Sequence, residues 1–159
     1  MTHNSPPSDL AHIVRLALQE DIGDGDVTSL LIAKDLQVKA HIICREEAIL
    51  CGIAWVEEAY RNIDGSISIR WNFKDGDTLK KGVQVAEITG NARAILTGER
   101  TALNFLQTLS GTATITRQYT ERLKGTSTIL LDTRKTLPGM RNSEIYAVMV
   151  AGGSNHRKG

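Results

Sequence analysis

A short apolar segment at 128–131, Thr-Ile-Leu-Leu, most constrains the fold, because it lies between two segments with helical character. A run this short, without alternation of polar and apolar residues, is typical of a strand buried in a parallel sheet. The turn at 138–139 (Pro-Gly) follows, and Asn142 or Ser143 is placed to cap a helix that continues to Val150. This order of strand, loop and helix predicts one βα unit of an α/β fold.

The longest helical segment precedes this strand and runs from Thr97 to Lys124. Thr97 is a suitable N-cap, Glu99 lies near the positive end of the helix dipole, and Gly125 is a natural stop. One face is expected to contact the core through residues at helical spacing: Ala102, Leu106, Leu109 and Ala113.

Two shorter helices are expected earlier in the chain. The first covers Asp9 to Glu20, with Ser8 or Asp9 as cap. The second covers Ile53 to Arg61 and follows Gly52. The core face of the first helix is predicted from the spacing of Ile13, Leu16 and Ala17.

The region between 38 and 90 is otherwise predicted to form strands. Val38, Ala40 and Ile42 alternate with polar neighbours, and so do the apolar residues of 66–73. Residues 75–90 resemble the turn-rich hairpin of lipoyl and biotinyl carrier domains, with two lysines at 80–81. The residues that typically flank an attachment lysine are missing, so a structural hairpin is the favoured interpretation and a carrier module the weaker one.

The composition, 41% apolar and 23% charged residues, is that of a globular protein, and a net charge of +1 argues against bulk binding to nucleic acid or membranes. No signal peptide and no run of 18 apolar residues is visible. Cys44 and Cys51 lack metal or redox spacing and are typical of reduced core thiols. Together these features favour a cytoplasmic protein.

The basic residues are unevenly distributed. Residues 133–159 hold five of the 19 basic and one of the 18 acidic side chains, a net charge of +4, whereas 1–132 carry −3. This segment follows directly on the predicted strand, and the carboxyl ends of parallel strands are where α/β proteins bind ligands. The segment is therefore predicted to form a site for a small polyanion.

Two clusters carry the candidate site residues. The first is Thr133, Arg134 and Lys135, and the second is His156 and Arg157. Arginine can pair with both oxygens of a carboxylate, and lysine supplies a point charge suited to phosphate. The glycines at 152–153 are expected to let backbone N–H groups approach the anion. The sequence shows no catalytic triad, HExxH motif, P-loop or dinucleotide fingerprint.

Four motifs in order resemble those of the quinolinate phosphoribosyltransferases. They are Glu20-Asp-Ile-Gly-Asp-Gly-Asp-Val-Thr-Ser, Gly98-Glu-Arg-Thr-Ala-Leu-Asn-Phe-Leu-Gln, Asp132-Thr-Arg-Lys-Thr-Leu-Pro-Gly-Met-Arg and Gly152-Gly-Ser-Asn-His-Arg. The resemblance implies transfer of a phosphoribosyl group from phosphoribosyl pyrophosphate to quinolinate, with magnesium, giving nicotinate mononucleotide, pyrophosphate and carbon dioxide.

The resemblance also implies a fold and roles for residues. An α/β sandwich domain (1–110) would be followed by the first part of an α/β barrel (111–159). Arg134, His156 and Arg157 would hold the quinolinate carboxylates, while Thr133 and Lys135 would serve the substrates, Lys135 as the catalytic residue. Arg100 would reach the site from the partner subunit of a homodimer.

The sequence departs from the family pattern near its end. Ile145 stands where the family usually has lysine, and Ala151 where it usually has glycine. The later lysine motif and the acidic residues that hold magnesium are missing from these 159 residues. The expectation is therefore a truncated chain with negligible turnover alone, or a non-catalytic remnant that still dimerises.

Overall fold

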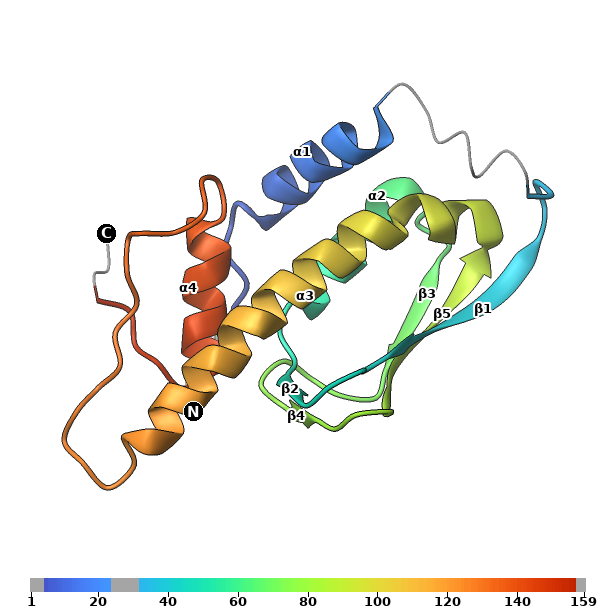
Figure 1. Cartoon of the computed structure of the whole chain (residues 1–159). Helices are drawn as coiled ribbons and strands as arrows, with labels where there is room; N and C mark the ends of the chain where they lie inside the picture. The colour runs from blue at the N-terminus through green and yellow to red at the C-terminus, as the bar shows by residue number, and fades with distance from the viewer. Residues whose placement is uncertain (1–4, 24–31, 157–159) are drawn as a thin grey trace.

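A computed structural model describes residues 5–23 and 32–156. The elements follow the order α1 (Leu10–Ile22), β1 (Gln37–Ile43), β2 (Ala48–Ile49), α2 (Ile53–Ile63), β3 (Ser68–Trp71), β4 (Thr78–Leu79), β5 (Gln84–Asn91), α3 (Ala92–Arg122) and α4 (Arg141–Val150). Figure 1 shows α3 crossing the molecule diagonally, with the larger sheet beside its first half and α4 beside its second half. No helix in these two ranges is long and apolar enough to cross a membrane.

The larger sheet has the strand order β1-β5-β3, and both pairings are antiparallel. Its register places Ala40 and Ile69 opposite Ile88 on β5, so that the three side chains share one face. Ile88 is only 3% exposed because this face contacts the helices. The predicted alternation in 38–42 and 66–73 is therefore confirmed.

The opposite face of this sheet is polar. Glu87 lies opposite His41 and Arg70, and its carboxylate is 3.7 Å from Lys39 Nζ and 3.6 Å from Arg70 Nη2. Both cations are mostly exposed, so these ion pairs contribute little to stability. One apolar face and one polar face are what a two-layer α/β sandwich requires.

Helices α2 and α3 close the core above the sheet. Trp55 and Val56 on α2 are fully buried, and so are Leu109 and Ala113 on α3. The four residues predicted to form the core face of the long helix are all buried: Ala102, Leu106, Leu109 and Ala113. This part of the sequence prediction is confirmed.

The long helix begins earlier than predicted. Its N-cap is Asn91, whose side chain accepts a hydrogen bond from the N–H of Ala94 at 3.2 Å, and Thr97 lies inside the helix. Asparagine is as good a cap as threonine, and the segment after it, Ala-Arg-Ala-Ile-Leu, has high helix propensity. At the other end the prediction holds, since Gly125 has a φ of 82° and follows the last turn.

Helix α1 forms where predicted but buries a different face. Leu10, Val14 and Leu18 are buried, whereas Leu16 is 51% exposed. Residues four apart form one continuous stripe, and in this helix two neighbouring stripes are apolar. The sequence pattern alone could not tell which stripe faces the core, so the assignment of Leu16 was wrong.

The expected hairpin at 75–90 is also wrong. Residues 78–79 (β4) pair with 48–49 (β2), whereas 84–91 (β5) pair with β1 and β3 in another sheet. The turn between them is present, with Gly82 at a φ of 87°. Because the strands that flank Lys80 and Lys81 do not pair with each other, the structural basis for a carrier module is lost.

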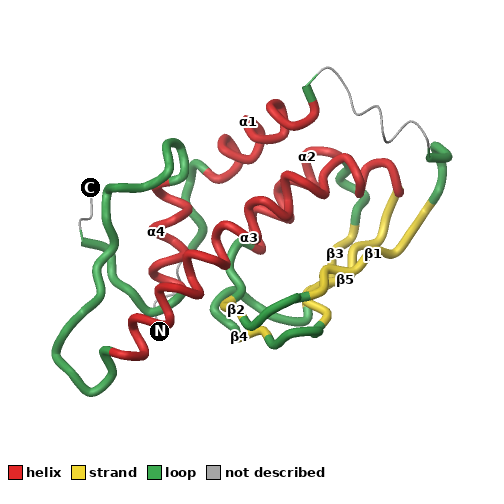
Figure 2. The backbone as a smooth tube through the Cα atoms, in the orientation of Figure 1, coloured by secondary structure: helices red, strands yellow, loops and turns green. Residues whose placement is uncertain are grey.

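The segment 128–131 does not form the buried strand that was predicted. It makes one parallel bridge, Leu131 to Ser154, and Ile129 and Leu131 are 67% and 48% exposed. A parallel strand is buried only when strands or helices cover it on both sides. Figure 2 shows the segment as loop beside α4, without such neighbours among the described residues.

Helix α4 also begins without either predicted cap. Met140 is at the N-cap position and makes no side-chain bond, while the amide of Asn142 donates to the carboxylate of Asp9 at 2.8 Å. Ser143 is fully buried, and its hydroxyl has no hydrogen-bond partner. Neither side chain therefore caps α4: Ser143 faces the body of the protein, and the exposed Asn142 bonds to Asp9 instead.

We predict opposite effects for two glycine-to-alanine changes in α3. A Cβ at Gly98 would lie 2.7 Å from Ile63 Cδ1 and 2.9 Å from Tyr60 Cε1, so Gly98→Ala should destabilise by about 1–3 kcal/mol. A Cβ at Gly111 would meet nothing within 4 Å, so Gly111→Ala should stabilise by about 0.5–1 kcal/mol. Urea unfolding of both variants measures this, and equal effects would contradict the close contact of α2 with α3.

Candidate anion-binding site

The two predicted clusters of site residues meet through a short parallel pairing of the backbone. The N–H of Ser154 donates to the carbonyl of Leu130 at 2.9 Å, and the N–H of Asp132 donates to the carbonyl of Ser154 at 3.0 Å. The backbone segments 130–132 and 154–156 therefore run side by side in the same direction. As a result, residues 133–135, which follow the first segment, lie at the same edge as His156 at the end of the second.

Asp132 joins the two clusters directly. Its Oδ1 accepts a hydrogen bond from the N–H of His156 at 2.8 Å, while its buried Oδ2 has no partner. The side chain thus fixes the backbone of the second cluster against the end of the first. Asp132 was part of a quoted motif, but its sequence position gave no sign of this role, because the role depends on a contact between residues 24 positions apart.

The first cluster is open to solvent. Thr133, Arg134 and Lys135 are all exposed, and so is His156 in the second cluster. The Oγ1 of Thr133 accepts from the N–H of Lys135 at 3.2 Å, which bends the chain directly after the strand end. Exposed cations on a bent, locally fixed backbone can bind an anion without first giving up a strong internal ion pair.

The expectation that 152–153 offer N–H groups to an anion is wrong. The N–H of Gly152 donates to the carbonyl of Met149, and that of Gly153 donates to the carbonyl of Val148 at 2.9 Å. These bonds close the C-terminal end of α4. Gly153 is needed for space, because a Cβ there would lie 2.5 Å from Val148 Cγ1.

Of the remaining two candidate residues, the structure describes only Arg100, and it does not lie at this edge. Arg157 lies outside the described residues. Arg100 is exposed on α3, and its Nε is 2.6 Å from the carboxylate of Asp21 in the same chain. Arg117, further along the same helix, contacts the end of α4. The distance along the helix axis from Arg100 to Arg117 is about 26 Å. Within one chain, Arg100 and the two clusters are therefore separate.

Helix α4, which connects the two clusters, is anchored by a buried polar contact that the sequence did not reveal. The hydroxyl of Tyr146 donates to Oδ2 of Asp75 at 2.8 Å, while Oδ1 accepts from the N–H groups of Gly52 and Ile53 at the start of α2. The Tyr146 ring lies against Trp55, with ring centroids 5.3 Å apart. One carboxylate therefore links α2, α4 and the loop between β3 and β4.

This arrangement shifts the pKa values of Asp75 and Tyr146. Burial raises the pKa of Asp75 above its ordinary value, and the hydrogen bonds from Tyr146, Ile53 and Gly52 only partly oppose it. Burial, together with the nearby Asp75 carboxylate, raises the pKa of Tyr146 as well. Both shifts have the same cause, which is that an ionised group at this contact loses its hydration.

The described residues do not fit a magnesium site. No group of three or more His, Cys, Asp or Glu side chains in 5–23 and 32–156 is placed to hold a metal ion. At the cationic edge, Asp132 Oδ2 is a carboxylate oxygen without a partner, but a magnesium site needs further oxygen ligands beside it. No magnesium-dependent step is therefore assigned to these residues.

The fold and the site together define a two-part α/β protein with a cationic edge. Family models agree with this class. Residues 26–110 match the model described as "Quinolinate phosphoribosyl transferase, N-terminal domain", and residues 112–159 match the corresponding C-terminal domain. The chain belongs to the quinolinate phosphoribosyltransferase family.

Individual relatives show the same relationship. The chain is 44% identical over 140 residues to a probable nicotinate-nucleotide pyrophosphorylase (carboxylating) of Bacillus subtilis, covering 88% of this chain and 48% of the relative. It is 40% identical over 156 residues to a quinolinate phosphoribosyltransferase (decarboxylating) of Nicotiana tabacum. This match covers 97% of this chain and 44% of the relative. The nicotinate-nucleotide pyrophosphorylase structure from Francisella tularensis matches with a TM-score of 0.93 and 45% sequence identity. This match covers 98% of this chain and 56% of the other chain.

The predicted family and fold class are thereby confirmed. The α/β sandwich is followed by the first part of an α/β barrel, whose opening unit is the segment 128–131, α4 and the parallel partner at 154. The chain spans about half the length of the relatives it matches.

We predict that Asp75→Asn changes how stability depends on pH. Because the pKa of Asp75 is raised in the folded state, the folded chain binds more protons, and its free energy of unfolding falls as pH rises from about 4. Asparagine keeps an acceptor for Gly52 and Ile53 but does not ionise, so this slope should disappear. Urea unfolding at several pH values measures it, with the exposed Asp35→Asn as control. A slope in Asp75→Asn equal to that of the wild type would contradict the assignment.

Proposed function

We propose that this chain supplies the dicarboxylate-binding part of a quinolinate phosphoribosyltransferase. The full reaction joins quinolinate to phosphoribosyl pyrophosphate and gives nicotinate mononucleotide, pyrophosphate and carbon dioxide, in the biosynthesis of NAD. The observation that carries the proposal is the parallel contact of 130–132 with 154–156, which brings Arg134, Lys135 and His156 to one edge. Family membership supports it independently.

The chemistry of quinolinate fits these side chains. Quinolinate is a planar dianion with two adjacent carboxylates, and a guanidinium forms two parallel hydrogen bonds with one carboxylate. Arg134 would hold one carboxylate, and His156 with Arg157 the other. The hydroxyl of Thr133 offers a neutral donor beside them. Fixing both carboxylates would orient the ring so that its nitrogen faces the C1 atom of the ribose.

Lys135 is proposed as the catalytic residue at the same edge. When the bond between C1 and pyrophosphate breaks, negative charge builds up on the departing pyrophosphate and positive charge on the sugar. An ammonium group fixed beside the departing oxygens stabilises that negative charge. After ribosylation the positive charge on the ring nitrogen stabilises the electron pair that departing carbon dioxide leaves on the adjacent ring carbon, and this carbon then takes up a proton from water. Positioning and electrostatics therefore suffice without a covalent enzyme intermediate.

The proposal includes a division of the chain and a partner. Residues 1–110 would form the sandwich domain and 111–159 the start of the barrel, with α3 running through both. Arg100 lies far from the edge of its own chain and is exposed. It would exchange its ion pair with Asp21 for a substrate held by the second subunit of a homodimer. We propose the cytoplasm as the site of action.

We predict that the 159-residue chain binds quinolinate and that Arg134→Ala weakens this binding roughly 10- to 100-fold, the value of a charge-assisted hydrogen-bonded contact. Arg134→Lys should lose less quinolinate affinity than Arg134→Ala, because lysine keeps the positive charge but lacks the paired donors of a guanidinium. The matched control is Arg70→Ala, an exposed arginine on the polar face of the sheet. Isothermal titration calorimetry measures the affinities, and equal binding by wild type and Arg134→Ala would contradict the site.

We predict negligible turnover by these 159 residues alone when quinolinate, phosphoribosyl pyrophosphate and magnesium are supplied. The described residues offer cations for the anions but no cluster of acidic groups for the metal. Release of labelled carbon dioxide and formation of nicotinate mononucleotide are the measurements. Ordinary turnover would show that the missing acidic residues are not required. Absence of both turnover and quinolinate binding would favour the non-catalytic remnant.

A further inference from the structure

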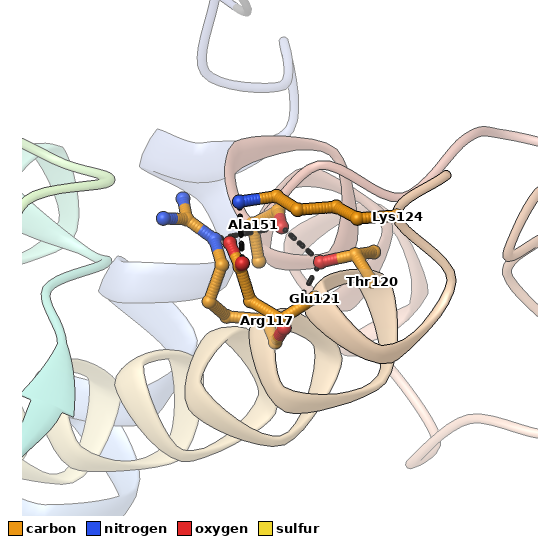
Figure 3. A network of polar contacts seen from close by, with 5 residues as sticks. All are labelled: Arg117, Thr120, Glu121, Lys124 and Ala151. Carbon is orange, nitrogen blue, oxygen red and sulfur yellow. Dashed lines mark hydrogen bonds and ion pairs between the residues drawn. The ribbon is translucent and has the colours of Figure 1, made fainter. Parts of the chain in front are cut away.

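Arg117 on α3 makes contacts that the site described above does not use. Its Nε donates to the carbonyl of Ala151 at 3.0 Å, and its Nη2 lies 3.5 Å from the carbonyls of Gly76 and Val150. Figure 3 shows the guanidinium pointing from α3 toward Ala151, at the end of α4. A cation at this end of a helix interacts favourably with the negative end of the helix dipole and with its unpaired carbonyls.

Thr120, one turn further along α3, strengthens the same contact. Its hydroxyl lies 3.2 Å from the carbonyl of Ala151 and 3.0 Å from that of Arg117. Ala151 is completely buried. In Figure 3 the neighbouring Glu121 and Lys124 form their own ion pair on α3. The end of α4 is therefore held by two side chains of α3 on a single carbonyl.

The chain between Ala151 and His156 has little freedom after this point. Gly152 and Gly153 both donate back into α4, and Gly153 has no room for a side chain. Ser154 then pairs with Leu130, and the N–H of His156 donates to Asp132. The segment is thus fixed at its start by α3 and at its end by Asp132, and only four residues, 152–155, lie between Ala151 and His156.

We infer that Arg117, assisted by Thr120, is a positioning residue for the second anion-binding cluster: it sets the place of residues 152–156 and, through them, the approach of His156 to a dicarboxylate. The inference rests on the proposed function only for the identity of the anion. The carbonyl of Gly76 lies in the loop that also holds Asp75, so the same guanidinium aligns the cluster with the sandwich domain.

If Arg117 only stabilised the fold in general, its loss would affect amide exchange throughout the protein and not mainly at the end of α4. Arg117 is half-buried, and its hydrogen bonds reach the carbonyls of Ala151, Val150 and Gly76, which lie outside the strands of the larger sheet, so its loss should loosen the end of α4 rather than the sheet. Local opening is measured residue by residue through the exchange of amide hydrogens. The N–H groups of Ser154 and His156 report on the segment, and those of β5 report on the sandwich.

The experiment uses the whole 159-residue chain with Arg117→Met, which keeps an apolar stem but removes every donor, and with Arg117→Lys and Thr120→Val. The matched control is Arg122→Met, an exposed arginine on the same helix. Amide exchange is followed by NMR, and quinolinate affinity is measured by calorimetry on the same samples.

We expect Arg117→Met to raise exchange at Ser154 and His156 by about tenfold or more, and to weaken quinolinate binding by a similar factor, while β5 stays protected. Arg117→Lys should retain part of the amide protection and part of the quinolinate affinity. Thr120→Val should show smaller changes in the same direction as Arg117→Met, and Arg122→Met should show none. Unchanged exchange at Ser154 and His156 would overturn the inference, and so would equal loss of protection in β5 and the segment. If wild type binds no quinolinate, the proposed function fails, and exchange alone still decides the role of Arg117.

Discussion

The structure depends on one long helix, α3, which packs against the sandwich over one part of its length and against α4 over another. Helix α3 has 31 residues and is about 46 Å long. Its first half closes the sandwich through residues such as Phe105 and Leu106, and its later turns hold the end of α4 through Arg117 and Thr120. Since a helix of this length is a stiff rod, it fixes the start of the barrel relative to the sandwich without any flexible linker.

A second constraint is the buried polar contact between the two parts. Asp75 caps the start of α2 and accepts from Tyr146 of α4, next to the contact of Trp55 with Tyr146. Burying a carboxylate is costly unless its oxygens are hydrogen-bonded, and here three donors satisfy them. Such a contact tolerates little displacement, so it specifies one orientation of α4 and hence of both clusters.

The sequence predicted the helices and the alternating strands well because their patterns are local. It failed where a choice depended on distant residues. Leu16 lies on one of two apolar stripes, and only the position of α2 and α3 decides which is buried. Residues 75–90 have the turn of a hairpin, but β4 and β5 find partners elsewhere. The start of α3 was missed because Asn91, which ends β5, also caps the helix.

The candidate site shows the same division. Arg134 and Lys135 could be proposed from the sequence because basic residues beside a predicted strand end are a local signal, and His156 because it lies in a second basic cluster. The residues that place them could not be found: Asp132, Arg117 and the Asp75–Tyr146 pair act only through contacts between remote segments. Gly152 was misjudged for a related reason, since the sequence does not reveal that its N–H is already bonded within α4.

These contacts also explain how the two clusters meet although the strand expected at 128–131 has not formed. In a complete parallel sheet, neighbouring strands would fix the strand ends. Among the described residues one bridge, Leu131 to Ser154, does so, and Ile129 remains exposed. The second cluster is instead held from the helix side, by Arg117 at Ala151, and from the first cluster, by Asp132 at His156. The arrangement of the cationic edge is thus set mainly by side chains that bind backbone groups, before any sheet around it is closed.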